Sequence, residues 1–165
     1  MRIIVEKLIQ AEVGTVWADI YPYQIEANMH AAWGPHKDNV RPDIIIKHKD
    51  TGDMTLIELT CPFEWTEGIN DAHKRKVAKY TPYVQAVRAN EDNRHLKVSL
   101  LCIEVGSRGY VANTAIGLGP ILNLDDKPLR QFLVQLGRTS FLQSLRILKN
   151  ANQIRRTEDT GPLHV

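Results

Sequence analysis

Two apolar segments separated by a short run of turn-forming residues constrain the fold of this chain more than any other feature. Residues 44–46 and 54–61 have the apolar, β-branched composition of strands, and residues 50–53 (DTGD) lie between them. Aspartate and glycine favour tight turns, so the pattern predicts a β-hairpin with a four-residue loop. In the register that this loop implies, Lys49 lies opposite Met54.

The segments after the hairpin follow the order helix, then strand. Residues 68–80 favour a helix, which we expect to kink or restart at Thr81-Pro82, because threonine caps helices and proline suits their first position. Residues 96–105 are nearly all apolar, as in a strand that is covered on both faces. This order predicts a βαβ crossover with parallel strands. With the hairpin, it predicts an α/β fold in which a small mixed β-sheet is flanked by helices.

The remaining segments complete a single domain. Residues 2–12 have the spacing of a short amphipathic helix, residues 15–27 that of one or two strands, and residues 28–41 are rich in loop formers. A long helix with regularly spaced leucines begins at residues 125–128. We therefore predict one domain over residues 1–156 and a flexible C-terminal tail over residues 157–165.

Composition excludes several classes of protein. Of the 165 residues, 43% are hydrophobic and 24% are charged, which is ordinary for a globular domain and excludes bulk disorder. A net charge of +2 does not by itself indicate a nucleic-acid partner. No apolar run approaches the roughly 18 residues of a membrane span, and the charged start is unlike a signal peptide. Cys61 and Cys102 are too few for a zinc site or a disulfide framework, so we expect buried, reduced thiols in an intracellular protein.

Two carboxylates are expected to share one face of the hairpin. In the predicted register Asp43 lies opposite Thr60, and Ile45 lies opposite Glu58. Paired residues share a face, as do residues two apart on one strand, so Asp43, Glu58 and Thr60 project from the same side. Two carboxylates at this spacing suit a hard cation such as Mg²⁺. The alternative is an edge strand on which Glu58 simply faces water.

The helix after the hairpin adds a cation to this cluster. Its apolar stripe consists of Ile69, Ala72 and Tyr80. Lys76 falls in the middle of the stripe, and a lysine on a packing face needs an anion or a route to water. We therefore expect Lys76 to meet the carboxylates or a bound phosphate, with Lys79 on the flank of the same face. His73 is interpreted as an ordinary hydrogen-bonded residue.

These residues form a known pattern. Pro42-Asp43, fourteen further residues and then Glu58-Leu59-Thr60 resemble the PD-(D/E)xK nuclease signature, with Thr60 in the position of its lysine. The longer pattern resembles the restriction-like endonuclease domain of site-specific non-LTR retrotransposons. Its motifs correspond here to Arg41-Pro42-Asp43, Glu58-Leu59-Thr60, Pro62-Phe63-Glu64, Lys76 with Lys79-Tyr80, and residues 104–110 (EVGSRGY). The resemblance covers residues 40–110 well and the final helix loosely; the upstream Arg-His pair and Cys/His knuckle of many members have no counterpart in this sequence.

The resemblance implies a restriction-endonuclease-like (PD-(D/E)xK) core and the activity of a Mg²⁺-dependent (or Mn²⁺-dependent) endodeoxyribonuclease. The implied metal ligands are Asp43, Glu58 and the backbone carbonyl of Leu59. The implied catalytic residues are Asp43, Glu58, Lys76 and Lys79, with Lys76 in place of the lysine that the strand lacks. The implied DNA contacts are Lys79, Arg108 and Arg41.

In its retrotransposon setting, such a domain nicks target DNA and supplies the 3′ end for reverse transcription. The resemblance implies a reverse transcriptase in the same full-length polypeptide, DNA as partner, no membrane partner, and an intracellular location that is nuclear in a eukaryotic host. From the net charge we expect weak, salt-sensitive DNA binding. Two alternatives stay open: a catalytically inactive DNA-binding module with a nuclease fold, favoured by Thr60 and the absent upstream motifs, and a Holliday-junction-resolvase-like enzyme, which would have to be a dimer.

Overall fold

The computed structural model describes the backbone of residues 1–21, 42–63 and 66–159, and the side chains of these residues except 66, 92 and 152–159. The strands are β1 (Gly14–Ala18), β2 (Ile44–His48), β3 (Met54–Thr60) and β4 (Val98–Glu104). The helices are α1 (Arg2–Gln10), α3 (Thr66–Ala89), α4 (Leu118–Leu122) and α5 (Asp126–Asp159), with short 3₁₀ turns at Glu91–Asn93 and Asn113–Gly117. The predicted loop over residues 28–41, and the end of the predicted strand region over 15–27, lie outside the described residues.

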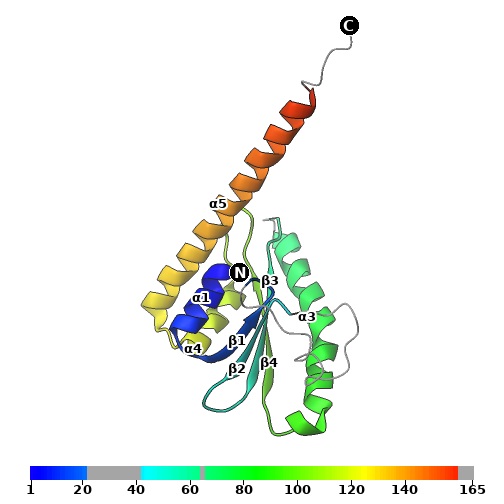
Figure 1. Cartoon of the computed structure of the whole chain (residues 1–165), viewed down its shortest axis with the longest axis vertical. Coiled ribbons are helices and arrows are strands. Elements are labelled where there is room, and N and C mark those ends of the chain that lie inside the picture. The colour runs from blue at the N-terminus through cyan, green and yellow to red at the C-terminus, as the bar shows by residue number, and fades with distance from the viewer. Residues whose placement is uncertain (22–41, 64–65, 160–165) are drawn as a thin grey trace.

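The strands form one mixed sheet in the order β1-β2-β3-β4 (Figure 1). β1, β2 and β3 pair antiparallel, whereas β3 and β4 pair parallel and are joined through α3. The predicted hairpin and βαβ crossover are therefore both present. The fold prediction is confirmed: the chain is α/β, with a small mixed sheet flanked by helices.

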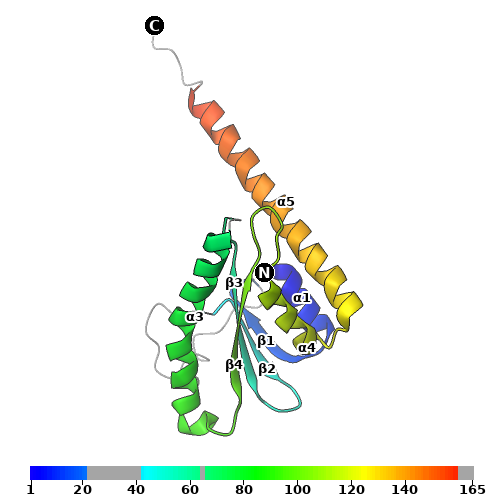
Figure 2. The same cartoon turned by 180° about the vertical axis from the view of Figure 1, so that it is seen from behind.

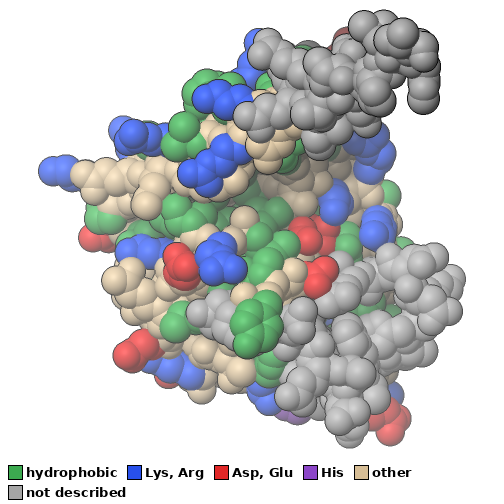
Figure 3. All heavy atoms as spheres, turned by 45° about the horizontal axis from the view of Figure 1, so that its top comes forward, with side chains coloured by type: hydrophobic (Ala, Val, Ile, Leu, Met, Phe, Trp, Pro, Cys, Tyr) green, Lys and Arg blue, Asp and Glu red, His purple; other side chains and the backbone are tan. Residues whose placement is uncertain are grey.

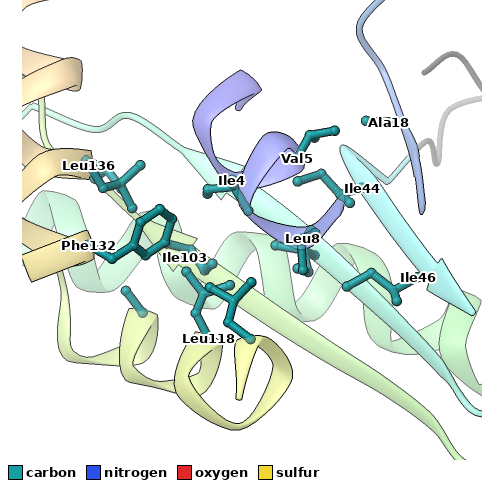
Figure 4. Close-up of a cluster of buried hydrophobic side chains, with 14 of the residues drawn as sticks. Ile4, Val5, Leu8, Ala18, Ile44, Ile46, Ile103, Leu118, Phe132 and Leu136 are labelled. Carbon is teal, nitrogen blue, oxygen red and sulfur yellow. The ribbon is translucent and has the colours of Figure 1, made fainter. Parts of the chain in front are cut away.

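Helices cover both faces of the sheet. α3 lies on one face, whereas α1, α4 and the start of α5 lie on the other (Figures 1 and 2). Alternation along β2 directs Ile45 toward α3 and directs Ile44 and Ile46 toward the other helices. The larger core on the α1 side joins Ile44 and Ile46 to Leu8, Ile103 and Phe132, among others (Figure 4).

The hairpin register differs from the predicted one by two residues. Ile44 pairs with Ile57 and Lys47 pairs with Met54, so the connection is longer than four residues. The amide of His48 donates to the carbonyl of Asp53 at 2.9 Å, and the amide of Gly52 donates back to His48 at 2.9 Å. These bonds close a wider turn, in which Gly52 adopts a φ of +73°. Because the shift is an even number of residues, each strand residue keeps its predicted face.

α3 is one helix, so of the two predicted outcomes at Thr81-Pro82, a kink or a restart, the restart is wrong. Instead of capping a new helix, the Thr81 hydroxyl donates to the carbonyl of Val77 at 2.7 Å, one turn earlier. Pro82 lies inside the helix. Tyr80 and Tyr83, one on each side of Thr81-Pro82, are both buried, and this burial of the sheet-facing side of α3 stabilises both halves of the helix together.

α5 is longer than its packing surface. Its first turns bury Leu129, Phe132 and Leu136 in the core, and the helix then projects beyond the sheet (Figures 1 and 2). It runs to Asp159, so residues 157–159 of the predicted tail are helical. A Cβ atom on Gly137 would lie 2.3 Å from the carbonyl oxygen of Gly109, so glycine allows α5 to approach the loop after β4 closely. Among the described helices, none has a stretch apolar and long enough to cross a bilayer.

Candidate active site

Asp43 and Glu58 face each other across two neighbouring strands. Continuing the observed register by one residue places Asp43, just before β2, directly opposite Glu58 in β3. The backbone amide of Asp43 donates to Oε1 of Glu58 at 3.1 Å. In return, the amide of Leu59 donates to Oδ2 of Asp43 at 2.7 Å. These two bonds hold both carboxylates at one end of the sheet. The predicted register places Asp43 opposite Thr60, but on the same face as Glu58.

Glu58 is a buried carboxylate with several donors around it. Its side chain is 1% exposed, so it does not face water as the alternative interpretation requires. The ammonium group of Lys76 donates to Oε2, and the hydroxyl of Tyr80 also hydrogen-bonds the carboxylate. Burial raises the pKa of Glu58, the hydrogen bonds from Lys76 and Tyr80 oppose this rise, and the negative charge of Asp43 adds to it. A second positive charge near Asp43 and Glu58 would reduce the repulsion that remains between their carboxylates.

Lys76 reaches Glu58 from α3, as the helical spacing predicted. It forms an ion pair with Glu58, and its side chain is 28% exposed, so solvent or a ligand can reach it. Its Nζ also lies 5.8 Å from the centroid of the Tyr80 ring. Lys79, one turn later, is exposed, and its Nζ lies 5.0 Å from the same ring. Lys76 therefore belongs to the carboxylate cluster, whereas Lys79 lies at its rim.

The donor set suits a hard divalent cation. Asp43 and Glu58 offer carboxylate oxygens, and Mg²⁺ sites commonly use one or two carboxylates with water and substrate phosphate as the other ligands. Within the described ranges, no three His, Cys, Asp or Glu side chains gather closely enough to form a complete metal site. The residues thus fit an ion that shares its coordination shell with substrate. By themselves, the described side chains do not complete the coordination shell of an ion.

A second buried carboxylate, Glu104, was missed by the sequence reasoning. It ends β4, pairs with Thr60 across the parallel ladder and is 1% exposed. Its Oε1 lies 3.0 Å from Nδ1 of His73, and its Oε2 accepts a hydrogen bond from the Thr114 hydroxyl at 2.8 Å. His73 is hydrogen-bonded as interpreted, but its partner is an acidic residue next to the candidate site. The signal was available, because Glu104 interrupts an apolar run just as Glu58 does.

Arg108 is the remaining predicted site residue that the structure describes. Arg108, in the loop after β4, places its guanidinium 5.6 Å from the centroid of the Phe63 ring. The amide of Ser107 donates to the carbonyl of Pro62 at 3.3 Å, which ties that loop to the segment after β3. Arg41 lies outside the described residues, as does Glu64.

The two cysteines have different environments. Cys102 is buried in β4 beside Glu58, and burial raises the pKa of its thiol to about 11. Cys61 is exposed, which corrects the expectation that both thiols are buried. The reason is its position: it follows the last residue of β3 and has left the sheet.

A cleft of about 370 Å³ opens beside Asp43. Asp43, Leu59 and Thr60 line it from the sheet, and Ser140 and Gln143 line it from α5. A ligand that enters this cleft therefore contacts both the candidate metal-binding end of the sheet and the long C-terminal helix.

Comparison with known proteins gives partial structural likenesses. No family model and no curated protein matches the chain. A solved structure of a Phenuiviridae cap-snatching endonuclease shares 21% identity with a TM-score of 0.45, over 70% of this chain and 48% of that one. A Toscana virus cap-snatching endonuclease shares 24% identity with a TM-score of 0.40, over 68% of this chain and 52% of that one. The chain spans about half the length of these structures. A functional assignment therefore depends on the side chains of this chain.

Proposed function

We propose that this chain is a metal-dependent nuclease domain that hydrolyses phosphodiester bonds of DNA. The observation that carries the proposal is the meeting of Asp43, Glu58 and Lys76 at one end of the sheet. This hydrolysis needs carboxylates that bind a cation and an ammonium group that contacts a phosphate. These three residues supply two carboxylates and one ammonium group. The resemblance to the PD-(D/E)xK signature also supports it, because Asp43 and Glu58, the acidic residues of that signature, are residues that the fold brings together.

Asp43, Glu58 and the Leu59 carbonyl would hold the Mg²⁺ or Mn²⁺ ion. When bound, such an ion lowers the pKa of coordinated water and neutralises charge on the scissile phosphate. The protein's own part is to position and to stabilise charge. Glu58 and Tyr80 fix the ammonium group of Lys76, which donates a hydrogen bond to the attacking water or to a phosphate oxygen. Water attack forms a new phosphorus–oxygen bond, and the bond to the leaving 3′ oxygen breaks.

The location of Lys76 explains how Thr60 is compatible with this chemistry. In the signature, the strand itself supplies the lysine two residues after the acidic residue. Here that position is Thr60, and α3 supplies a lysine to the same carboxylate from above the sheet. Lys79, Arg108 and Arg41 are proposed phosphate contacts around the site. Lys79 is also the alternative to Lys76 as the catalytic lysine.

The wider biological setting is also a proposal. The motifs of residues 40–110 resemble the endonuclease of site-specific retrotransposons, which supports a role in nicking target DNA before reverse transcription. On this basis we infer a reverse transcriptase in the same full-length polypeptide and an intracellular protein, nuclear in a eukaryotic host. A resolvase-like nuclease remains the alternative if the domain forms a dimer.

One observation favours a second function, DNA binding without cleavage. Lys76 already neutralises Glu58 directly, so the carboxylate has a cationic partner without any metal ion. In such a module the ion pair would be structural. A divalent cation should stabilise and activate a nuclease, but it should do neither for an inactive module.

The deciding experiment combines cleavage with metal-dependent stability. We expect the wild-type domain to convert supercoiled plasmid to nicked circles with Mg²⁺ or Mn²⁺, but not with EDTA. Either ion should also raise the melting temperature, because it binds the folded state. Asp43→Asn should lose both effects and still melt cooperatively. A wild-type protein that binds DNA but shows neither cleavage nor a metal-dependent melting shift would support the inactive module instead.

A further inference from the structure

Positive charge is concentrated in one helix. Residues 127–156, nearly all of α5, contain seven of the 21 Lys and Arg residues and none of the 19 Asp and Glu residues. The rest of the chain therefore has 14 basic and 19 acidic residues, a formal charge of −5 against +7 for this helical segment. The overall charge of +2 thus combines a strongly basic helix with an acidic body.

The basic side chains of α5 are accessible to an anionic partner. Lys127, Arg130, Arg138, Arg146 and Lys149 are all exposed. Within the described part of the chain, the ion pairs involve other residues, so these five cations have no carboxylate partner there. Figure 3, in which the projecting end of the molecule is turned toward the viewer, shows Lys and Arg side chains along this region. Unpaired cations on an exposed helix favour binding of a polyanion.

α5 also borders the candidate active site. Ser140 and Gln143 line the cleft that contains Asp43, and the helix continues past that cleft away from the sheet (Figures 1 and 2). Arg146 follows Gln143 by three residues, which places it roughly 60° around the helix axis from the cleft-facing side. A polymer that reaches Asp43 through this cleft therefore passes Arg146 first, and the other basic residues of α5 lie farther around the helix.

We propose that α5 binds the sugar-phosphate backbone of the DNA on which the candidate site acts; this inference rests on the proposed function. Lys127, Arg138 and Lys149 are 11 residues apart, about three helical turns, so they form a row along the helix. The row is about 33 Å long at 1.5 Å per residue, close to one turn of duplex DNA. Basic side chains that contact phosphates contribute affinity without sequence selectivity. The row lies roughly 120–160° around the helix axis from Gln143, which lines the cleft, and Arg146 lies between them. DNA bound on the row would therefore run along the outer side of α5 and reach the cleft past Arg146.

DNA affinity measured in EDTA tests this inference without any contribution from cleavage. Fluorescence anisotropy of a labelled duplex would compare wild type with the α5 variant Arg138→Gln/Arg146→Gln/Lys149→Gln. The matched control, Lys47→Gln/Lys49→Gln/Lys97→Gln, removes the same charge from exposed residues at the opposite end of the sheet. We expect the α5 variant to bind at least about tenfold more weakly at 50 mM salt. The slope of log K against log salt should become shallower by about 0.9 for each lost phosphate contact. The control should stay within about threefold of wild type.

Two results from the charge variants would overturn the inference. One is an equal loss of affinity in both triple variants, because net charge alone would then explain the binding. The other is an α5 variant that binds like wild type. Leu142→Gln/Leu148→Gln adds a further arm, because both leucines are exposed on α5. If this variant, with its charges unchanged, loses more DNA affinity than the charge variant, apolar contacts and not phosphate contacts carry the binding, and the inference fails.

Folding and function are controlled separately. Far-ultraviolet circular dichroism checks that each variant keeps its helices, and the single variant Arg146→Gln replaces the triple variant if the latter unfolds. Its salt slope should still change by about 0.9. Plasmid cleavage by wild type decides the proposed function on its own. A protein that binds DNA through α5 but never cuts would refute the nuclease and leave the binding surface intact.

Discussion

Replacing Lys76 by methionine tests the centre of the candidate site most directly. The substitution keeps the aliphatic length of the side chain but removes the ammonium group that pairs with Glu58. Lys79→Met is its matched control, because Lys79 is on the same helix and near the same Tyr80 ring but is exposed. The pair of variants separates the charge at Glu58 from positive charge on α3 in general.

The expected loss of stability follows from the burial of the two partners. Removing one partner of a fully buried ion pair costs about 3–5 kcal/mol. Lys76 is 28% exposed, so water screens part of this interaction, and Tyr80 and the Asp43 amide continue to donate to Glu58. We therefore expect Lys76→Met to cost about 1–3 kcal/mol, or roughly 2–10 °C in melting temperature. Lys79→Met should change the free energy of unfolding by less than about 0.5 kcal/mol.

The pH dependence of this loss has a defined sign. Burial raises the folded-state pKa of Glu58 above that of an unfolded glutamate, about 4.3. The folded state thus favours protonated Glu58, and stability falls as pH rises through the raised pKa. Without Lys76 the pKa of Glu58 should rise further, so the melting temperatures of wild type and Lys76→Met should diverge above about pH 4.3 and converge below it.

Cleavage gives the second readout for the same variants. If Lys76 stabilises charge on the scissile phosphate, Lys76→Met should lower the rate by roughly 10²–10³-fold at unchanged DNA affinity. Lys79→Met should act mainly on affinity. A penalty of Lys76→Met that does not depend on pH would refute the coupling to Glu58. Wild-type cleavage by Lys76→Met together with an inactive Lys79→Met would show that Lys79 is the catalytic lysine.

Further substitutions test the two buried acidic residues. Glu58→Gln should abolish cleavage, yet its free energy of unfolding should rise relative to wild type as pH increases above about 4.3, because the amide has no charge to bury; a constant difference from pH 4 to 8 in urea titrations would contradict this. Glu104→Ala should destabilise the domain by about 1–3 kcal/mol in the same titrations, because His73 and Thr114 lose a buried acceptor. Glu104→Gln keeps an acceptor oxygen and should cost less; an equal loss in both variants would mean that the charge, and not the hydrogen bonding, matters.

The strands of the hairpin and the faces of its residues were predicted correctly, whereas its register was not. Apolar alternation and turn residues were sufficient to identify β2 and β3 and to place Asp43 and Glu58 on one face. The register was wrong by two residues, because the turn chemistry of residues 50–53 did not reveal that His48 and Asp53 close the loop. The face assignment was unaffected, since side chains alternate with a period of two.

The helix after the hairpin gave a similar result. The position of Lys76 within an apolar stripe correctly predicted contact with the carboxylates, since helical spacing sets which residues meet the sheet. The predicted restart at Thr81 does not occur, because packing of both halves of α3 on one sheet outweighs the local tendency of Thr-Pro to start a helix.

The sequence alone determined the element types, the mixed sheet and the pair Asp43 and Glu58, because each depends on short-range periodicity or on residues joined by one turn. Only the tertiary structure decided which distant residues complete the site. Glu104 and His73 are 31 residues apart in the chain and meet because β4 pairs with β3 beneath α3. Likewise, α5 borders the cleft of Asp43 because its leucines pack on the opposite face of the sheet. Such contacts depend on the free energy of burying whole faces, which no local pattern encodes.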